Sequence, residues 1–103
     1  MDEVRLKKGI QQLNEWLIML DGENIGFLYG NFRYFDYIKL QRKYRGKGYA
    51  RKAIKLYVDK ARESGVSKMK TTKILNQNVK NTLLDLGFQP CENSEDIYEF
   101  YFK

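Results

Sequence analysis

Charged and flexible residues alternate in the segment Arg45-Gly46-Lys47-Gly48-Tyr49-Ala50-Arg51. An apolar stretch with helical spacing starts at its end, so the amide groups of the first helical turn lack backbone partners and lie at the positive end of the helix dipole. A phosphate or pyrophosphate fits such a position, and the two glycines let it approach the backbone closely. The pattern predicts an anion-binding loop. A plain connection between a strand and a helix is the alternative interpretation.

The loop is held between two elements of different period. Tyr37–Leu40 upstream is typical of a strand, and the segment downstream is typical of an amphipathic helix that ends at Ser64-Gly65. Small or apolar residues form one stripe of that helix: Ala50, Ala53, Ile54, Tyr57, Val58 and Ala61.

Neither the Walker pattern nor the three-glycine dinucleotide fingerprint is present in this loop. It resembles instead the acyl-CoA loop of the GNAT superfamily of N-acetyltransferases, whose pattern is Gln/Arg-x-x-Gly-x-Gly/Ala. Arg45, Gly48 and Ala50 meet that pattern. The loop is therefore similar to the cofactor loop of this family.

A second stretch resembles the same family. In the family an asparagine after the fifth strand begins a helix that ends in Leu-Gly-Phe, and Asn76 and Leu86-Gly87-Phe88 stand at these positions. Asn76 or Asn78 also suits a helix cap, and Gly87 suits a helix end. The resemblance covers nearly all of the segment from Trp16 to Lys103.

Composition excludes several classes of enzyme. The chain has no histidine and a single cysteine, Cys91, so it lacks an intramolecular disulfide, a His/Cys metal cluster and a Ser-His or Cys-His nucleophile pair. The net charge of +6 favours anionic partners such as CoA, acidic peptides or nucleic acid. The N-terminus does not read as a signal peptide, and we expect a cytoplasmic protein without a membrane partner.

We expect one domain over residues 1–103, of the α/β (α+β mixed sheet) class and with a GNAT-like fold. An antiparallel meander comes first and a β-α-β-α-β segment follows, with a parallel crossover around the first helix. Strands are predicted within 4–13 (a helical turn near Ile10 and Leu13 is the alternative) and at 15–20, 25–32, 33–40, 66–74 and 97–102, a hairpin turn at 21–24, and a second helix at 77–86.

The finer predictions concern three places. We expect a bend or bulge at Gly30-Asn31 and a break in the chain at Pro90. In the strand before the loop, strict alternation predicts Tyr34, Asp36, Ile38 and Leu40 on one face, with Phe35 and Tyr37 on the other.

The resemblance implies a direct attack of an amine on the thioester carbonyl of acetyl-CoA, used as a cosubstrate without a metal. Backbone groups of Ile38 and Leu40 would pair with the pantetheine arm, and the Leu40 N–H would polarise the thioester carbonyl. Asn76 would touch the cofactor or an ordered water. The pyrophosphate would rest on the backbone of Arg45, Gly46, Lys47, Gly48, Tyr49, Ala50 and Arg51.

The acceptor amine must lose a proton before it attacks, and a strand carboxylate is the family's usual solution. Asp36 is the acid on the relevant strand, so it is the candidate base, with Glu15 and Glu23 as alternatives. Tyr34 and Tyr37 line the acceptor groove in this interpretation, whereas a place in the core is the alternative. The acceptor itself is a protein lysine or N-terminus, or a small molecule.

Two departures from the family support a second hypothesis. Leu83 stands where the family usually has a tyrosine that acts as general acid toward the CoA thiolate, so Tyr44, Tyr49 or water would have to supply the proton. Residues Ile10–Asn14 leave no room for the helices that usually follow the first strand. The alternative is therefore a catalytically weak or silent binding module for a protein or nucleic-acid partner, although nucleic acid is disfavoured because the basic helix face lacks interleaved aromatics. The aromatic last strand predicts a free sheet edge and, through it, a homodimer.

Overall fold

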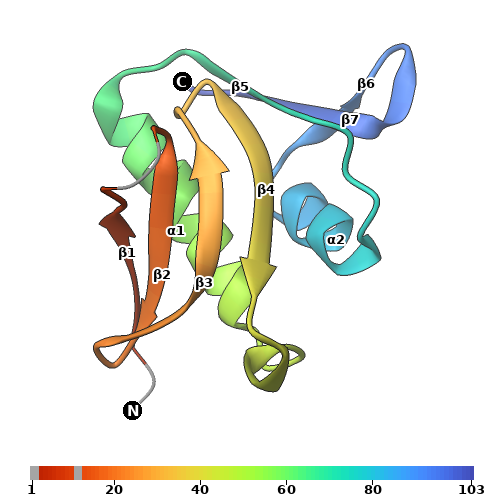
Figure 1. The fold of residues 1–103 in the computed structure, drawn as a ribbon. Coiled ribbons are helices and arrows are strands. Elements are labelled where there is room, and N and C mark those ends of the chain that lie inside the picture. The colour runs from red at the N-terminus through yellow and green to blue at the C-terminus, as the bar shows by residue number, and fades with distance from the viewer. Residues whose placement is uncertain (1–2, 11–12) are drawn as a thin grey trace.

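The computed structural model describes residues 3–10 and 13–103. Over this part of the chain it contains a seven-stranded sheet, two α-helices and one short 3-10 turn, η1 (Figure 1). The elements are β1 (Val4–Lys8), β2 (Glu15–Leu20), β3 (Glu23–Gly30), β4 (Tyr34–Leu40), η1 (Arg42–Tyr44), α1 (Tyr49–Ser64), β5 (Lys68–Thr71), α2 (Gln77–Asp85), β6 (Gln89–Cys91) and β7 (Ser94–Tyr101).

The strands lie side by side in the order β1-β2-β3-β4-β5-β7-β6. Strands β1 to β4 form an antiparallel meander, and β4 and β5 form the one parallel pair among the described strands, with α1 as the crossover between them. The mixed α/β fold predicted from the sequence is confirmed.

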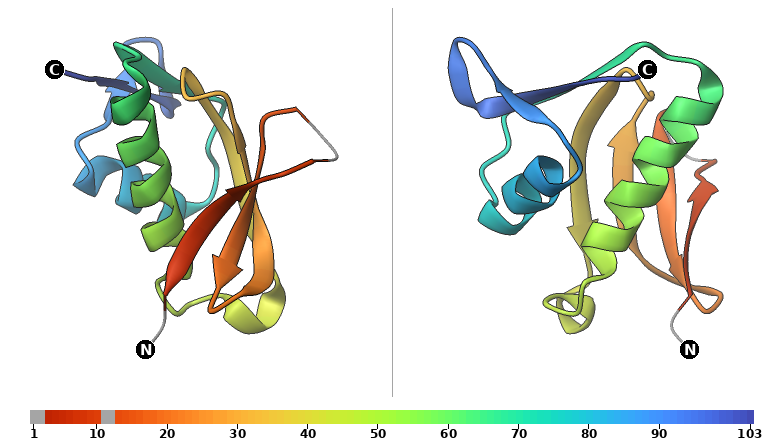
Figure 2. Two further views of the ribbon diagram at one scale, coloured as in Figure 1. Left: turned by 90° about the vertical axis from the view of Figure 1, so that its left-hand side faces the viewer. Right: turned by 180° about the vertical axis from the view of Figure 1, so that it is seen from behind.

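Both helices pack on the same side of the sheet (Figure 2), so the sheet has a helix side and an open side. The stripe predicted on α1 faces the sheet, because Ala53, Ile54, Tyr57, Val58 and Ala61 are buried. The largest fully buried side chains lie in this layer: Tyr57, Phe35, Ile18, Ile25, Leu28, Ile54, Met69 and Leu83.

Tyr57 is the polar anchor of the helix side. Its hydroxyl donates to the Tyr34 carbonyl at 2.5 Å and accepts from the Phe32 N–H at 2.8 Å. Gly30 passes so close that a Cβ there would lie 2.0 Å from the Tyr57 oxygen. This contact fixes α1 against the turn between β3 and β4.

The bend predicted at Gly30-Asn31 is confirmed, and it corrects the predicted faces of β4. Tyr29 pairs with Tyr37 and Gly30 with Phe35, so Asp36 is an extra residue in a β-bulge. The bulge breaks the alternation. Phe35 is buried on the helix side with Ile38 and Leu40, whereas Tyr37 is exposed; the prediction that Phe35 and Tyr37 share a face was wrong.

Three predictions about the C-terminal half also need correction. Pro90 does not break the chain but lies in β6, an edge strand, where a missing N–H is tolerated. The strand predicted at 66–74 is confined to Lys68–Thr71. The last strand begins at Ser94 and lies between β5 and β6, so the free edge on which the predicted homodimer rested is not there.

The first strand is confirmed at Val4–Lys8, and β2 follows it after residues 9–14. Ile10 and Leu13 are strongly exposed, and residues 11–12, which belong to the alternative helical turn, lie outside the described residues. In the described part of the chain, none of the helices has the length and apolar character needed to span a bilayer.

Candidate functional site

The site begins where β5 leaves β4. The two strands pair at Tyr34 with Lys70 and at Phe35 with Thr71, and the Thr72 hydroxyl then donates to the Asp36 carbonyl at 2.5 Å. Beyond Asp36 the described residues show no further hydrogen bond between the two strands. The second half of β4 is therefore a strand with one free edge inside the molecule.

A gap opens where β5 leaves β4. The register between β4 and β3 decides which backbone groups of β4 face this gap. Leu40 stands opposite Gly26, and the next residue, Gln41, donates its N–H to the Ile25 carbonyl at 2.8 Å. Hydrogen-bonded and non-bonded pairs alternate along antiparallel strands, so Ile38 and Leu40 belong to non-bonded pairs. Their N–H and C=O groups point away from β3, toward the gap.

The loop that follows β4 turns the chain into α1. Gly46 and Gly48 have φ angles of 75° and 86°, and a Cβ on either would meet nothing within 4 Å. Only glycine adopts this backbone conformation without strain, and the space in front of it is open. Gly48 is the N-cap of α1 and no side chain caps the helix there, so the first-turn amides of Ala50 and Arg51 stand at an uncapped helix N-terminus.

Positive charge surrounds this helix end, and the first turn of α1 contains no acidic residue. Arg45 folds back so that its Nε donates to the Leu40 carbonyl at 2.9 Å, which ties the loop to the end of β4. Arg51 reaches α2, where its guanidinium contacts the Asp85 carboxylate at 2.7 Å. Lys47 is exposed on the loop.

The gap, the loop and α2 enclose a groove of about 650 Å³. It is lined by Ile38, Lys39, Leu40, Arg45, Gly46, Gly48, Tyr49, Ala50, Arg51, Ile54, Asn76, Asn78, Val79 and Thr82. All the residues predicted to hold the cofactor line this groove except Lys47. Asn78, Val79 and Thr82 on the α2 wall were not predicted from the sequence, although the three-residue spacing of Asn76, Val79 and Thr82 indicates a shared side of the helix.

Asn76 has a structural task as well as a place in the groove. Its side-chain Oδ1 accepts the Val79 N–H at 3.1 Å, which makes it the N-cap of α2, as predicted.

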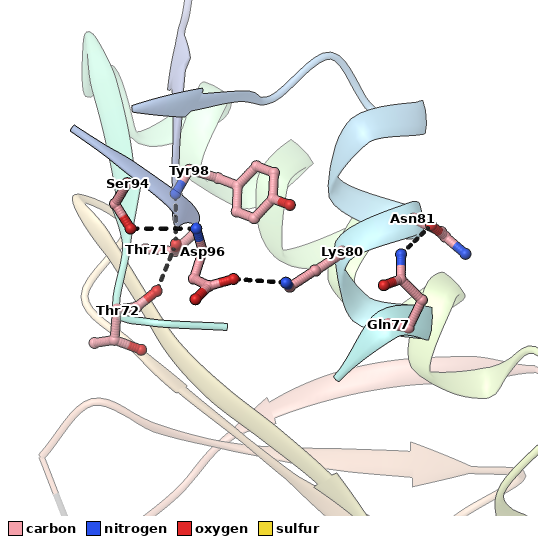
Figure 3. A network of polar contacts seen from close by, with 8 residues as sticks. All are labelled: Thr71, Thr72, Gln77, Lys80, Asn81, Ser94, Asp96 and Tyr98. Atoms are coloured by element: carbon pink, nitrogen blue, oxygen red, sulfur yellow. Dashed lines mark hydrogen bonds and ion pairs between the residues drawn. The ribbon is translucent and has the colours of Figure 1, made fainter. Parts of the chain in front are cut away.

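A polar network joins α2 to β7 (Figure 3). Lys80 on α2 contacts Asp96 on β7 at 2.6 Å, and the Asp96 N–H donates to the Ser94 hydroxyl at 3.2 Å. The hydrogen bond between the Lys80 and Asp96 side chains raises the pKa of Lys80 and lowers the pKa of Asp96. Next to it, the Thr71 hydroxyl accepts the Tyr98 N–H at 3.0 Å and so joins β5 to β7.

The candidate bases lie in three different surroundings. Asp36 is half-buried at the bulge, two residues before Ile38, and does not line the groove. Burial raises the pKa of the Tyr57 hydroxyl, and the nearby Asp36 carboxylate raises it further. Glu15 is buried and accepts the Tyr29 hydroxyl at 3.0 Å, whereas Glu23 accepts the Tyr44 hydroxyl at 3.1 Å.

The residues considered as proton donors also separate. Leu83 is fully buried and contributes nothing to the lining of the groove. Tyr49 lines it, and Tyr44 packs against Tyr49 with ring centroids 6.3 Å apart. Within residues 3–10 and 13–103, no group of three or more His, Cys, Asp or Glu side chains is arranged to hold a metal.

Comparison with known proteins agrees with this geometry. Residues 2–88 match the acetyltransferase (GNAT) family. A search of curated proteins found no significant match. Solved structures with the same fold include the PaiA N-acetyltransferase of Thermoplasma acidophilum in complex with coenzyme A (TM-score 0.65, 14% identity, 85% of this chain and 60% of that one).

Two further structures share the fold. They are Ard1 of Thermoplasma volcanium (TM-score 0.66, 12% identity, 87% of this chain and 71% of that one) and the GNAT family N-acetyltransferase YhbS of Escherichia coli in complex with CoA (TM-score 0.59, 17% identity, 84% of this chain and 57% of that one). The chain spans about 60% of the length of the Thermoplasma acidophilum enzyme.

Proposed function

Because the chain belongs to the acetyltransferase (GNAT) family, we propose that it transfers an acetyl group from acetyl-CoA directly to a primary amine of a protein or small molecule. The observation that carries the proposal is the groove in which the free edge of β4 meets the uncapped N-terminus of α1. We further propose that residues 1–103 act as one domain of this fold.

Each part of the groove has a task in this proposal. The amides of Ala50 and Arg51, in front of Gly46 and Gly48, hold the pyrophosphate at the positive end of α1. The gap-facing N–H and C=O of Ile38 and the N–H of Leu40 continue β4 by pairing with an extended arm, as a strand would, while Arg45 holds the Leu40 carbonyl. An N–H from this edge also stabilises negative charge on the thioester oxygen.

Asp36 is the proposed base, acting directly or through a water on the acceptor ammonium. Support comes from its half-exposed position in the bulge at the start of the gap, two residues before Ile38, which lines the groove. The amine then attacks the carbonyl carbon, and the C–S bond breaks to leave a thiolate, which is tolerable without a fixed donor because a thiol has an ordinary pKa of about 8.5.

The burial of Leu83 favours a second candidate function. The α2 wall presents Asn78, Val79 and Thr82 to the groove and no tyrosine. A domain of this kind that binds CoA without efficient turnover would act as a binding module for a protein or nucleic-acid partner.

The binding step is tested by calorimetric titration of CoA into wild type and two matched variants. Ala50→Glu puts a carboxylate in the first turn of α1, where it suits the helix dipole but repels a pyrophosphate. Ala50→Gln has nearly the same shape without the charge. We expect CoA affinity to fall at least about tenfold in the Glu variant relative to the Gln variant, since about 1.4 kcal/mol of repulsion suffices. Equal affinities, or no CoA binding by wild type, would contradict the proposed groove.

Catalysis is tested by thiol release from acetyl-CoA in the presence of small amines and lysine peptides. Asp36→Asn should lower kcat by roughly 10²-fold if the carboxylate is the base. Glu15→Gln and Glu23→Gln are the controls and should lower it much less. CoA binding without thiol release for any amine would instead support the binding module.

A further inference from the structure

The open side of the sheet carries aromatic side chains that no helix covers. Both described helices lie on the other side (Figure 2), and the open side of β1 to β4 faces the viewer in Figure 1. Cross-strand pairs place Phe27 beside Lys39 and Tyr29 beside Tyr37 on this side. Phe27 is 37% exposed and Tyr37 is 52% exposed. Tyr34, next to Lys70 on β5, is 50% exposed and extends the row.

Positive charge is interleaved with these rings. Lys7, Lys39 and Lys70 are exposed on the open side, and the described residues give none of them an ion-pair partner. Among the acids near these residues, Glu15 is only 6% exposed and accepts the Tyr29 hydroxyl. Glu99 on β7 stands opposite Lys70 and forms an ion pair with Lys68. The aromatic surface is therefore also a cationic one.

The rings are fixed in place rather than loose on the surface. Tyr29 and Tyr37 stack with centroids 4.9 Å apart, and Phe27 lies 6.3 Å from Tyr29. The hydrogen bond to the buried Glu15 holds the Tyr29 hydroxyl from below. Little side-chain entropy would be lost when a planar ligand settles on this platform.

We propose that this face, formed by Lys7, Phe27, Tyr29, Tyr34, Tyr37 and Lys70, binds single-stranded nucleic acid. Unpaired bases stack on the exposed rings, and the lysines contact the phosphates between them. Stacking on aromatic side chains together with a cationic surface is the general chemistry of single-strand binding, and it tolerates many sequences.

Charge decides between this occupant and the others. A second copy of the chain, packed face to face, would bring the same lysines against each other. A purely apolar partner would supply no counter-charge to Lys7 and Lys39. The outer face of α1 is also basic, through Lys52 and Lys55, but it lacks exposed rings, so a polyanion there would have charge contacts only.

The test is fluorescence anisotropy with a labelled, unstructured twelve-nucleotide pyrimidine-rich RNA, the DNA of the same sequence and the corresponding DNA duplex. Tyr37→Ala should weaken single-strand binding by about 5- to 150-fold, because stacking is worth about 1–3 kcal/mol per base. Tyr37→Phe, which keeps the ring, should restore most of the affinity. Circular dichroism checks that the variants are folded.

A pair of double variants separates this face from general basicity. Lys7→Ala with Lys70→Ala should weaken binding and reduce its salt dependence, whereas Lys52→Ala with Lys55→Ala removes the same charge from α1 and should change binding little. Preference for RNA or for DNA, with loss in Tyr37→Ala, supports the proposal and identifies the strand.

Several results would overturn it: no binding of either single strand at low salt, duplex bound as tightly as single strand, or equal losses from the two lysine pairs. If the wild type forms concentration-dependent dimers and Tyr37→Ala abolishes them, the face binds a second copy of the chain instead. None of these measurements uses CoA, so their outcome is independent of the proposed acetyl transfer.

Discussion

The two sides of the sheet use their tyrosines in opposite ways. On the helix side, Tyr57 is fully buried and its hydroxyl is consumed by two backbone groups, the Phe32 N–H and the Tyr34 carbonyl. On the open side, Tyr29 gives its hydroxyl to Glu15 and its ring to Tyr37, whose own ring is half in solvent. The first arrangement holds the fold together, whereas the second leaves aromatic surface available to a ligand.

The contrast continues along β4 itself. Phe35 belongs to the core, and its ring centroid lies 6.0 Å from that of Tyr57. Tyr37, two residues later, points to the other side of the sheet because Asp36 forms the bulge between them. A single extra residue therefore puts Phe35 in the core and Tyr37 on the exposed side of the same strand. Substitutions on the two sides should separate these roles.

The largest effect is expected for Phe35→Ala. The side chain is 1% exposed, and its loss leaves a cavity between the sheet and α1. The free energy of unfolding should fall by about 3–5 kcal/mol. Urea denaturation followed by circular dichroism measures this loss. A loss below about 1 kcal/mol would mean that the core repacks and fills the cavity.

Tyr57→Phe should come next. The ring stays in place, but the partly buried Phe32 N–H loses its acceptor, which costs about 1–3 kcal/mol of unfolding free energy. Tyr37→Phe is the matched control on the open side and should be nearly neutral. Equal losses in the two variants would remove the distinction drawn between the sides.

Tyr37→Ala should cost only about 1 kcal/mol, mainly the stacking with Tyr29. The same denaturation experiment measures this loss. A penalty as large as that of Phe35→Ala would show that the open face is needed for folding and weaken its assignment to a ligand.

The smallest effect appears only in alkali. Burial and the Glu15 carboxylate raise the pKa of Tyr29 to about 12, from an ordinary value of 10.0. The folded state thus keeps a proton that the unfolded state loses above pH 10, so stability falls as the pH rises from about 10 toward 12. Tyr29→Phe should reduce this fall between pH 9 and pH 11, measured as the shift in urea midpoint. Parallel pH profiles for the variant and wild type would contradict it.

Local sequence spacing was enough to predict most of the groove. The glycines of the loop, the stripe on α1, the Asn76 cap and the Gly65 helix end each follow from residues within a few positions of one another. Such features depend on backbone conformation and on helical or strand periodicity, which the sequence carries directly. For the same reason the predicted order of strands and helices is confirmed except for β6, which was not predicted, while the ends of β3, β5 and β7 are shifted.

Tertiary structure alone decided the rest, because it depends on which distant segments meet. The bulge at Asp36 arises from the register between β3 and β4, and it reversed the predicted face of Phe35 relative to Tyr37. Strand β7 runs antiparallel to β6 and lies between β6 and β5, so it does not have the free edge that was predicted for it. Alternation along a strand distinguishes two faces but does not say which one a helix will cover, so the exposed rings of Phe27 and Tyr37 become visible only in the folded chain.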